Sequence, residues 1–251
     1  MDSKDQSLEL TNVLASFTHR FYEIIDYREV ALTAIETIGP DLLAKKQHEV
    51  LAKSQNPELV GLKSYFENAL KIGLPEREVV KIVQKFNFIM ESSCLVFVHS
   101  LFDAGLFDLC KKISEFRPDL FDDLINKKEI KFNLIDAFKF DPIKEKSRQL
   151  NNFLAQFERD SIKKKIITIF ELCPKDIKVE GFKFDMGRIL KFDKVRHIII
   201  HGSSKTANDE NKIMINIEEE MKYIRFVFEY LFYRAASNLG YKIFFNYAKL
   251  I

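Results

Sequence analysis

The sequence predicts an all-α protein. Its 251 residues include only eight glycines and six prolines. Apolar side chains recur at intervals of three and four residues, the spacing of one face of a helix. The 47% hydrophobic and 30% charged content is typical of a globular chain, and a chain of this length can bury a sizeable core without disulfides. We therefore expect a helical bundle.

The expected helices are separated by glycine, proline and polar segments, which interrupt helical periodicity. Gly39–Pro40 ends the first helix, and Arg117–Pro118 ends a long apolar one. Ser161 is expected to start a new helix because serine is a good N-cap. The predicted helical segments are one before Gly39 that includes residues 14–25, then 41–54, 57–72, 76–115, a short helix between 118 and 141, 142–173, 186–201 and 217–238.

Three further segments are expected to differ from the helices. Residues 175–185 are predicted to form a loop, and residues 212–216 a short extended piece. The tail at 241–251 is too apolar for a free end, so we expect it to pack on the bundle or on a second subunit.

Charge and targeting signals limit the classes of function. The net charge of +2 is too small to predict a protein that binds nucleic acids non-specifically along their length. The lysines at 163–165 fit a solvated helix face, with a local basic patch as the alternative. The polar N-terminus has no apolar core for a signal peptide. No apolar run approaches the length of about 20 residues needed for a membrane span. We expect a cytoplasmic protein with no membrane partner.

Common enzyme motifs are missing from the sequence. It contains no GxGxxG or GxxxxGK[ST] phosphate loop, and no GxSxG or HExxH motif. The three cysteines, Cys94, Cys110 and Cys173, are widely spaced and suggest neither a zinc knuckle nor a disulfide framework. Such cysteine usage fits a reducing compartment. We expect no metal and no cofactor.

The five histidines divide into two groups. We expect His19 and His48 at the surface or half-buried, and His99, within VFVHSLF, as a hydrogen-bonded core histidine. The other two, His197 and His201, lie in DKVRHIIIH at 193–201, at the end of a predicted helix. With Asp193 they share one helix stripe, because residues four apart lie on the same face. A metal site on this stripe is an open alternative.

Arg196 and His201 carry a second pattern in the same segment. They are five residues apart, which corresponds to about 140° around an ideal helix. A site that uses both side chains therefore needs the reach of arginine, a distorted last turn, or a second subunit with a matching pair. The three isoleucines between them are expected to anchor the helix in the core, so that its polar ends are held rigidly.

Arg196-His197-Ile198-Ile199-Ile200-His201 resembles the R-x4-H signature of the HEPN superfamily. As in that family, it ends the penultimate helix and is followed by a polar loop and a last amphipathic helix. LFDAGLFDL, at 101–109, is similar to an early HEPN helix, with Asp103 at its acidic position and Gly105 in place of the usual large residue. The resemblance covers about residues 85–240. It implies an HEPN-like domain at 85–251, with residues 1–84 as an N-terminal helical extension packed on the bundle.

The resemblance implies a homodimer that cleaves RNA without a metal. The two R-x4-H segments would face each other across a cleft. His201 would act as general base or acid, which suits the near-neutral pKa of histidine. Arg196 would hold the phosphate and stabilise its developing charge. Supporting contacts are expected from His197 and Asp103, and RNA contacts from Lys194 and Lys205.

Proteins of this family serve as toxins or as antiviral abortive-infection effectors, and the resemblance also suggests a separate antitoxin or regulatory protein as a partner. One alternative is a non-catalytic HEPN-like module that binds RNA, nucleotide or a protein. The remaining alternatives are a structural helical protein and the metal site at Asp193, His197 and His201.

Overall fold

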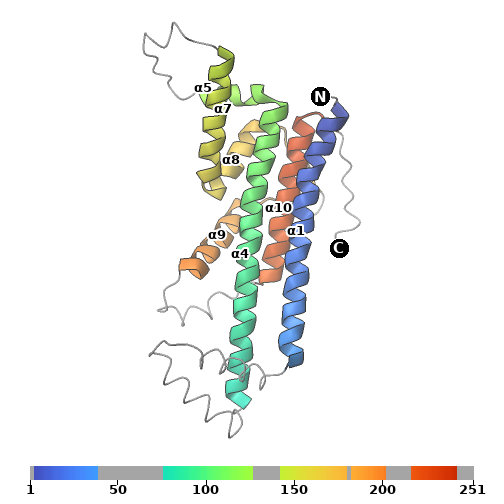
Figure 1. Cartoon of the computed structure of the whole chain (residues 1–251), viewed down its shortest axis with the longest axis vertical. Helices are drawn as coiled ribbons and strands as arrows, with labels where there is room; N and C mark the ends of the chain where they lie inside the picture. The colour runs from blue at the N-terminus through green and yellow to red at the C-terminus, as the bar shows by residue number, and fades with distance from the viewer. Residues whose placement is uncertain (1–2, 39–75, 127–141, 180–181, 202–215, 242–251) are drawn as a thin grey trace. The chain divides into compact units, whose positions relative to one another are not determined.

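The computed structural model describes residues 3–38, 76–126, 142–179, 182–201 and 216–241. Within these ranges every regular element is a helix and no strand occurs, so the all-α prediction is confirmed there (Figure 1). The predictions for 41–54, 57–72, 212–215 and 242–251 lie outside the described residues. The elements are α1 (Ser3–Ile38), α4 (Glu76–Phe116), the 3-10 helix η2 (Pro118–Phe121), α5 (Asp122–Asn126), α7 (Pro142–Arg159), α8 (Ile162–Leu172), α9 (Met186–His201) and α10 (Ile217–Asn238).

The chain forms two compact units. The first comprises residues 1–21 and 98–251, and the second comprises residues 22–97. The long helices α1 and α4 each contribute one part to each unit. The boundary between residues 84 and 85 that the sequence predicts falls inside α4 and stays a prediction.

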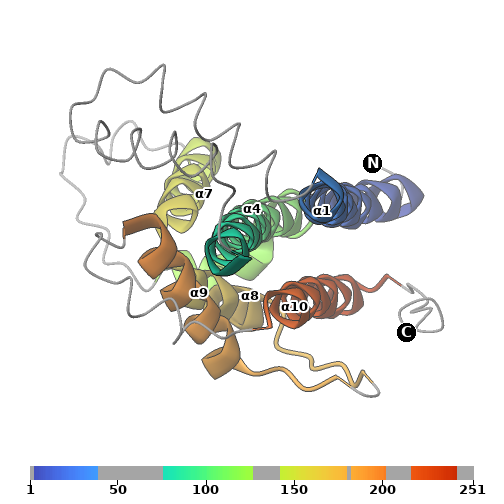
Figure 2. The same ribbon diagram turned by 90° about the horizontal axis from the view of Figure 1, so that it is seen from below.

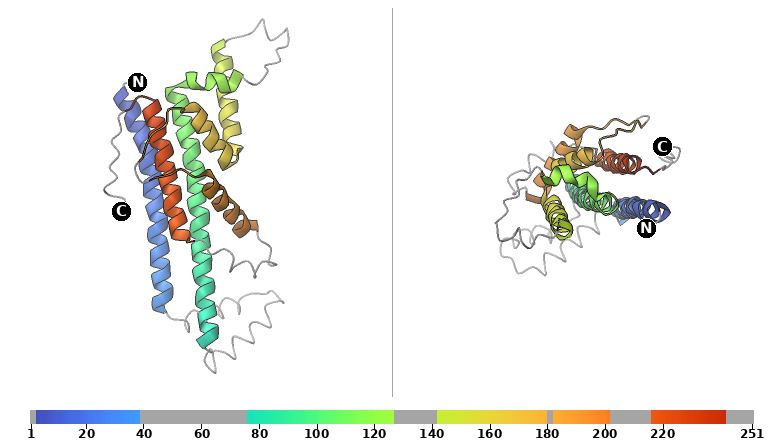
Figure 3. Two further views of the ribbon diagram at one scale, coloured as in Figure 1. Left: turned by 180° about the vertical axis from the view of Figure 1, so that it is seen from behind. Right: turned by 90° about the horizontal axis from the view of Figure 1, so that it is seen from above.

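The core of the first unit lies between the start of α1, the second half of α4 and α10, which run side by side (Figures 1 and 3). Phe17 of α1 stacks on Phe228 of α10 with ring centroids 3.8 Å apart. Phe228 also contacts Phe102 of α4 edge to face. All three rings are buried. Burial of such aromatic side chains is the main source of stability in a helical bundle.

The helix α4 ends where proline requires it. Arg117 precedes Pro118 and has φ −139° and ψ 66°, outside the helical region that a residue before proline avoids. The chain then turns through η2 and α5, and the buried Phe121 packs edge to face on Phe153 of α7. The predicted short helix after residue 118 is confirmed in the described part of this segment.

The helices α7 and α8 start with the expected signals. Pro142 opens α7 at a position where proline loses no hydrogen bond. Ser161 is the N-cap of α8, and its hydroxyl accepts a hydrogen bond from the backbone N–H of Lys164. The predicted restart at Ser161 is therefore confirmed.

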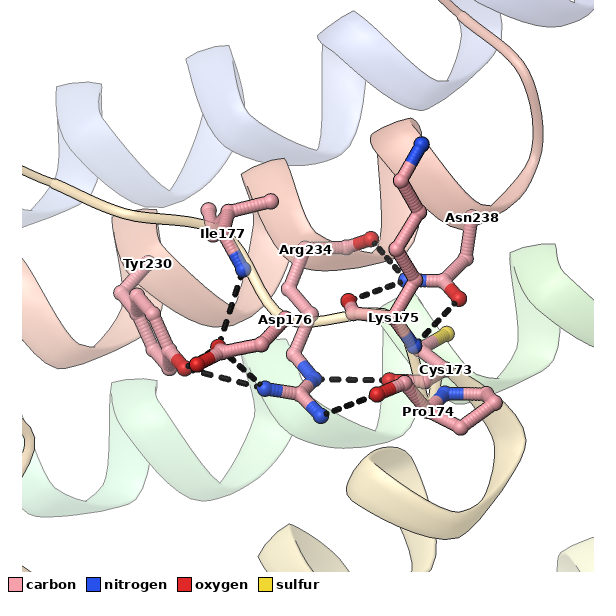
Figure 4. Close-up of polar contacts among 8 residues, drawn as sticks. All are labelled: Cys173, Pro174, Lys175, Asp176, Ile177, Tyr230, Arg234 and Asn238. Carbon is pink, nitrogen blue, oxygen red and sulfur yellow. Dashed lines mark hydrogen bonds and ion pairs between the residues drawn. The ribbon is translucent and has the colours of Figure 1, made fainter.

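The loop after α8 is fastened to α10 by Arg234 (Figure 4). Its guanidinium donates to the carbonyl oxygens of Cys173 and Pro174, at 2.7 and 3.0 Å, and to the carboxylate of Asp176 at 2.7 Å. Asn238 exchanges two hydrogen bonds with the backbone of Lys175. These contacts satisfy backbone carbonyls that immediately follow α8, and the predicted loop is confirmed over its described residues.

The last two helices have well-formed ends. The carboxylate of Asp185 accepts hydrogen bonds from the backbone N–H groups of Gly187 and Arg188 at the start of α9. Asn216 caps α10, whose first turn carries three glutamates, the favourable charge at a helix N-terminus. Gly240 follows α10 with φ +85°, the left-handed conformation that favours glycine after a helix.

The second unit contains the described segments 22–38 and 76–97. Its two helix segments are joined by a two-pronged ion pair between Arg28 of α1 and Glu91 of α4, with Nε–Oε2 and Nη2–Oε1 distances of 2.9 and 2.5 Å. Cys94 and Leu95 are fully buried in it. A planar guanidinium paired with a carboxylate in this way fixes orientation as well as charge.

One helical segment in the described part of the chain, residues 87–116 of α4, is long and apolar enough to cross a membrane by composition alone. This differs from the sequence expectation that no apolar run is long enough. Half of the tested window is buried inside the protein, as in the core helix of a globular fold. The absence of a membrane partner and the cytoplasmic location stay predictions.

Candidate functional site

The helix α9 carries most of the predicted site residues. It is anchored by Ile189, Phe192 and Val195, which are buried at three-residue intervals. The three isoleucines were expected to be the anchor, and this is wrong: Ile198 and Ile199 are half-buried, and Ile200 is 47% exposed. The physical reason is helical phase, because Ile200 lies about 140° around the helix from Val195.

The predicted site residues have different environments. Arg196 is half-buried, whereas Lys194 and His197 are exposed on α9. His201 is the last residue of α9, and its side chain lies outside the described residues, as does all of Lys205. The predicted roles of His201, His197, Lys194 and Lys205 therefore stay predictions.

Arg196 and Asp103 line the same pocket, which has a volume of about 270 Å³. Four helices supply its walls: α4, α7, α8 and α9, of which α8 and α9 lie one after the other along α4 (Figures 1 and 2). Two cations and three carboxylates line it together with a serine hydroxyl. The lining residues are Ser100, Asp103, Ala104, Phe107, Asp108, Glu158, Lys165 and Arg196.

Asp103 has a partner that the sequence did not indicate. The ammonium of Lys165 lies 2.7 Å from its carboxylate, and the Lys165 side chain is only 1% exposed. Lys163 and Lys164 are exposed, so the expectation of a solvated face is wrong for Lys165 alone. Its neighbours Ile162, Ile166 and Ile169 form the buried stripe of α8, which places Lys165 on the inner face of that helix.

Asp193 connects Arg196 to the core. Its Oδ1 lies 2.7 Å from Nε2 of His99 and 3.7 Å from Nε of Arg196. The second distance is an ion pair without a hydrogen bond. In the described part of the chain, Nε of Arg196 and Nδ1 of His99 are both buried without a hydrogen-bond partner. The prediction of a hydrogen-bonded core histidine at position 99 is confirmed.

The environment of His99 favours the neutral imidazole. Burial lowers the pKa of His99, and the nearby positive charge of Arg196 lowers it further, against the smaller opposing effects of Asp193 and Asp103. Nε2 must carry the proton, because it faces a carboxylate acceptor and Nδ1 faces none. His99 therefore donates a hydrogen bond to Asp193.

Neither thiol nor metal chemistry is evident in the described residues. Burial raises the pKa of all three thiols, to about 12 at Cys173, which keeps them protonated at neutral pH. No three His, Cys, Asp or Glu side chains meet there as metal ligands. The alternative metal site at Asp193, His197 and His201 includes a side chain outside those residues and stays a hypothesis.

The chain matches no protein-family model, no curated protein and no solved structure. The HEPN relationship therefore stays a resemblance carried by the motif.

Sequence reasoning missed three contributors to the pocket and its surroundings. For Lys165 a signal exists, because it lies three residues after Ile162 and four before Ile169, on the apolar stripe. For Glu158 and for the contact between His99 and Asp193 no local signal exists. His99 and Asp193 are 94 positions apart in the sequence, and their contact depends on how α4 packs against α9.

Proposed function

We propose that this protein is a metal-independent endoribonuclease of the HEPN type, with Arg196 and His201 as its catalytic residues. The observation that carries the proposal is the state of Arg196. Arg196 lines a pocket, its side chain is 30% exposed, and its Nε is buried without a hydrogen-bond partner in the described structure. The guanidinium is thus not fully engaged within the protein, and a phosphate in the pocket would pair with its positive charge.

The proposed reaction uses the nucleophile that RNA itself carries. The 2′-oxygen forms a bond to phosphorus while the bond from phosphorus to the 5′-oxygen breaks. The proton of the 2′-OH passes to a general base, and a general acid protonates the leaving 5′-oxygen. The products are a 2′,3′-cyclic phosphate and a 5′-OH end. The chemistry is redox-neutral and needs no cofactor.

The roles of the two residues follow from their chemistry. Arginine remains charged at all relevant pH values and can hold two phosphate oxygens at once. Histidine exchanges protons near neutrality, which suits His201, the last residue of α9, to general base or acid work. In the proposed site, one His201 takes the proton of the 2′-OH or donates a proton to the leaving 5′-oxygen.

The test is cleavage of a fluorescent single-stranded RNA in the presence of EDTA. We expect Arg196→Ala and His201→Ala each to lower the rate by about 100-fold or more. Lys191→Ala removes an exposed cation from the same helix, and His19→Ala removes an exposed histidine from α1; both should cut RNA like wild type. Undiminished cleavage by both Arg196→Ala and His201→Ala would overturn the proposal.

A mixing experiment tests the shared site. If each cleft uses residues of both protomers, a heterodimer of the Arg196→Ala and His201→Ala chains retains one intact pair. Mixing the two variants under conditions of subunit exchange should then restore activity. A purely monomeric chain, measured by light scattering, contradicts the shared cleft.

A second candidate is a non-catalytic module that binds RNA, a nucleotide or a protein. The observation that favours it is the ion pair between Asp103 and Lys165, which engages the acidic residue expected beside the site in a structural contact. RNA binding that weakens with salt, with no cleavage by wild type, would support this candidate. If the protein is an HEPN ribonuclease, the resemblance implies the role of a toxin or antiviral effector with a separate regulatory partner.

A further inference from the structure

His99, Asp193 and Arg196 form a chain of contacts from the core to the pocket. His99 lies on α4, and the other two lie on α9. One oxygen, Oδ1 of Asp193, is 2.7 Å from His99 Nε2 and 3.7 Å from Arg196 Nε. The carboxylate is thus hydrogen-bonded to the histidine but not to the arginine.

His99 is well placed to fix that carboxylate. It is 2% exposed, and its ring stacks on Phe192 with an interplanar angle of 9° and a centroid distance of 5.8 Å. The proton on Nε2 points to Asp193, because only this nitrogen has an acceptor in the described structure. A stacked, buried ring has little freedom to turn away.

Arg196 would ordinarily form a hydrogen-bonded ion pair with the carboxylate of Asp193. A carboxylate and a guanidinium three residues apart on a helix are neighbours, and such pairs often close into two parallel hydrogen bonds. Here the pair stays open, and in the described part of the chain Nε of Arg196 is buried without a hydrogen-bond partner. The hydrogen bond from His99 is the competing contact.

We propose that His99 is a positioning residue: by holding Asp193, it prevents a closed ion pair and keeps the guanidinium of Arg196 available to a phosphate in the pocket. The identification of that phosphate as part of RNA rests on the proposed function. The competition for Asp193 is independent of it.

Two substitutions separate this role from simple packing. His99→Gln keeps an N–H donor for Asp193, whereas His99→Leu removes it and stays apolar in the core. The NMR signal of the Arg196 Nε–H group, assigned by its loss in Arg196→Lys, reports the ion pair directly. We expect the signal to move downfield and to exchange more slowly with water in His99→Leu, and to stay near its wild-type position in His99→Gln.

Asp193→Asn provides the rescue. The amide oxygen still accepts from His99 but cannot form an ion pair with Arg196. Adding it to His99→Leu should reverse the NMR change. An Arg196 signal that is the same in wild type and in folded His99→Leu would overturn the inference.

RNA cleavage gives the functional readout. His99→Leu should lower kcat/KM by about three- to tenfold, the effect of one partly exposed ion pair, and Asp193→Asn should restore it. A loss that Asp193→Asn deepens overturns the inference, because Asp193 would then be orienting Arg196 rather than competing for it. If wild type does not cleave RNA, the proposed function fails, and the NMR comparison still decides the inference.

Discussion

Lys165 and Asp103 form an ion pair with unequal burial. The Nζ atom lies 2.7 Å from Oδ1, and the two residues are 62 positions apart on α8 and α4. The lysine side chain is 1% exposed and the aspartate side chain 40%. The ammonium therefore depends on this carboxylate, whereas the carboxylate can also be solvated. Removing Asp103 and removing Lys165 should therefore change the free energy of unfolding by different amounts.

We expect Asp103→Ala to lower the free energy of unfolding by about 2 kcal/mol, because it leaves a buried ammonium without its carboxylate. Asp103→Ala combined with Lys165→Met should recover most of this loss, since the methionine removes the charge. Asp108→Ala, an exposed carboxylate of the same pocket, serves as the control and should change stability by less than about 0.5 kcal/mol. Urea denaturation measures all three, and equal losses in the two single variants would contradict the account.

Gly105 shows why a large residue is missing from α4 at this position. A Cβ atom there would lie 2.7 Å from the ring of Phe228 and 3.1 Å from that of Phe17. The two rings stack in the core, so neither can move away cheaply. The departure from the HEPN pattern at Gly105 therefore has a steric reason in this chain.

Gly105→Ala should destabilise the protein by about 1 kcal/mol. The gain in helix propensity is about 1 kcal/mol, and overpacking a core costs typically 1 to 3 kcal/mol. The same Gly105→Ala change should cost less in a Phe228→Leu background, where the smaller side chain makes room for the methyl group. Ala104→Gly, at the exposed neighbouring position, reports the propensity effect alone. A Gly105→Ala protein that is more stable than wild type in thermal unfolding would disprove the steric argument.

Arg234 is expected to be the most important single side chain for the loop after α8. Arg234→Ala leaves the carbonyl oxygens of Cys173 and Pro174 without their donors and removes a cation stacked 4.6 Å from the centre of the Phe170 ring. We expect a loss of about 3 kcal/mol. Arg234→Lys keeps the charge but not the planar fork, and should show about half of that loss.

The matched control for Arg234 is Arg117→Ala. Arg117 is an exposed arginine that is also paired with an aspartate, Asp119, and its removal should change stability by less than about 1 kcal/mol. Chemical denaturation compares the two. Similar losses in Arg117→Ala and Arg234→Ala would show that the contacts to the loop contribute little.

The helix ends could be predicted because their signals are local. Proline after Arg117, the hydroxyl of Ser161 and the polar residues before Ile217 act on the backbone within a few residues. The structure accordingly confirms the predicted ranges 186–201 and 217–238.

The composition of the pocket could not be predicted in the same way. The motif predicts Asp103 and Arg196 as site residues, and both line one pocket. The burial of Lys165 and the contact between His99 and Asp193 arise from packing between helices distant in sequence, which no local pattern encodes. Ile200 shows the opposite error, because its apolar side chain predicts a core position but helical phase turns it toward the solvent.

His99 should make stability depend on pH near neutrality. Burial lowers its folded-state pKa below the ordinary value of 6.5, so the unfolded chain binds the proton more readily. Stability then rises with pH wherever the unfolded state holds more protons. The contribution of neutral His99 to the free energy of unfolding is complete above about pH 6.5. It is lost as the pH falls from there toward the folded-state pKa. The groups that set it are Arg196, Asp193 and Asp103.

The measurement is the free energy of unfolding of wild type and His99→Gln at intervals between pH 8 and pH 5. Wild type should lose stability as the pH falls, and His99→Gln should lose less, because glutamine does not titrate. His19→Gln, an exposed position on α1, is the matched control and should follow wild type. Parallel curves for wild type and His99→Gln would mean that His99 has the same pKa in the folded and unfolded chains, contrary to its burial.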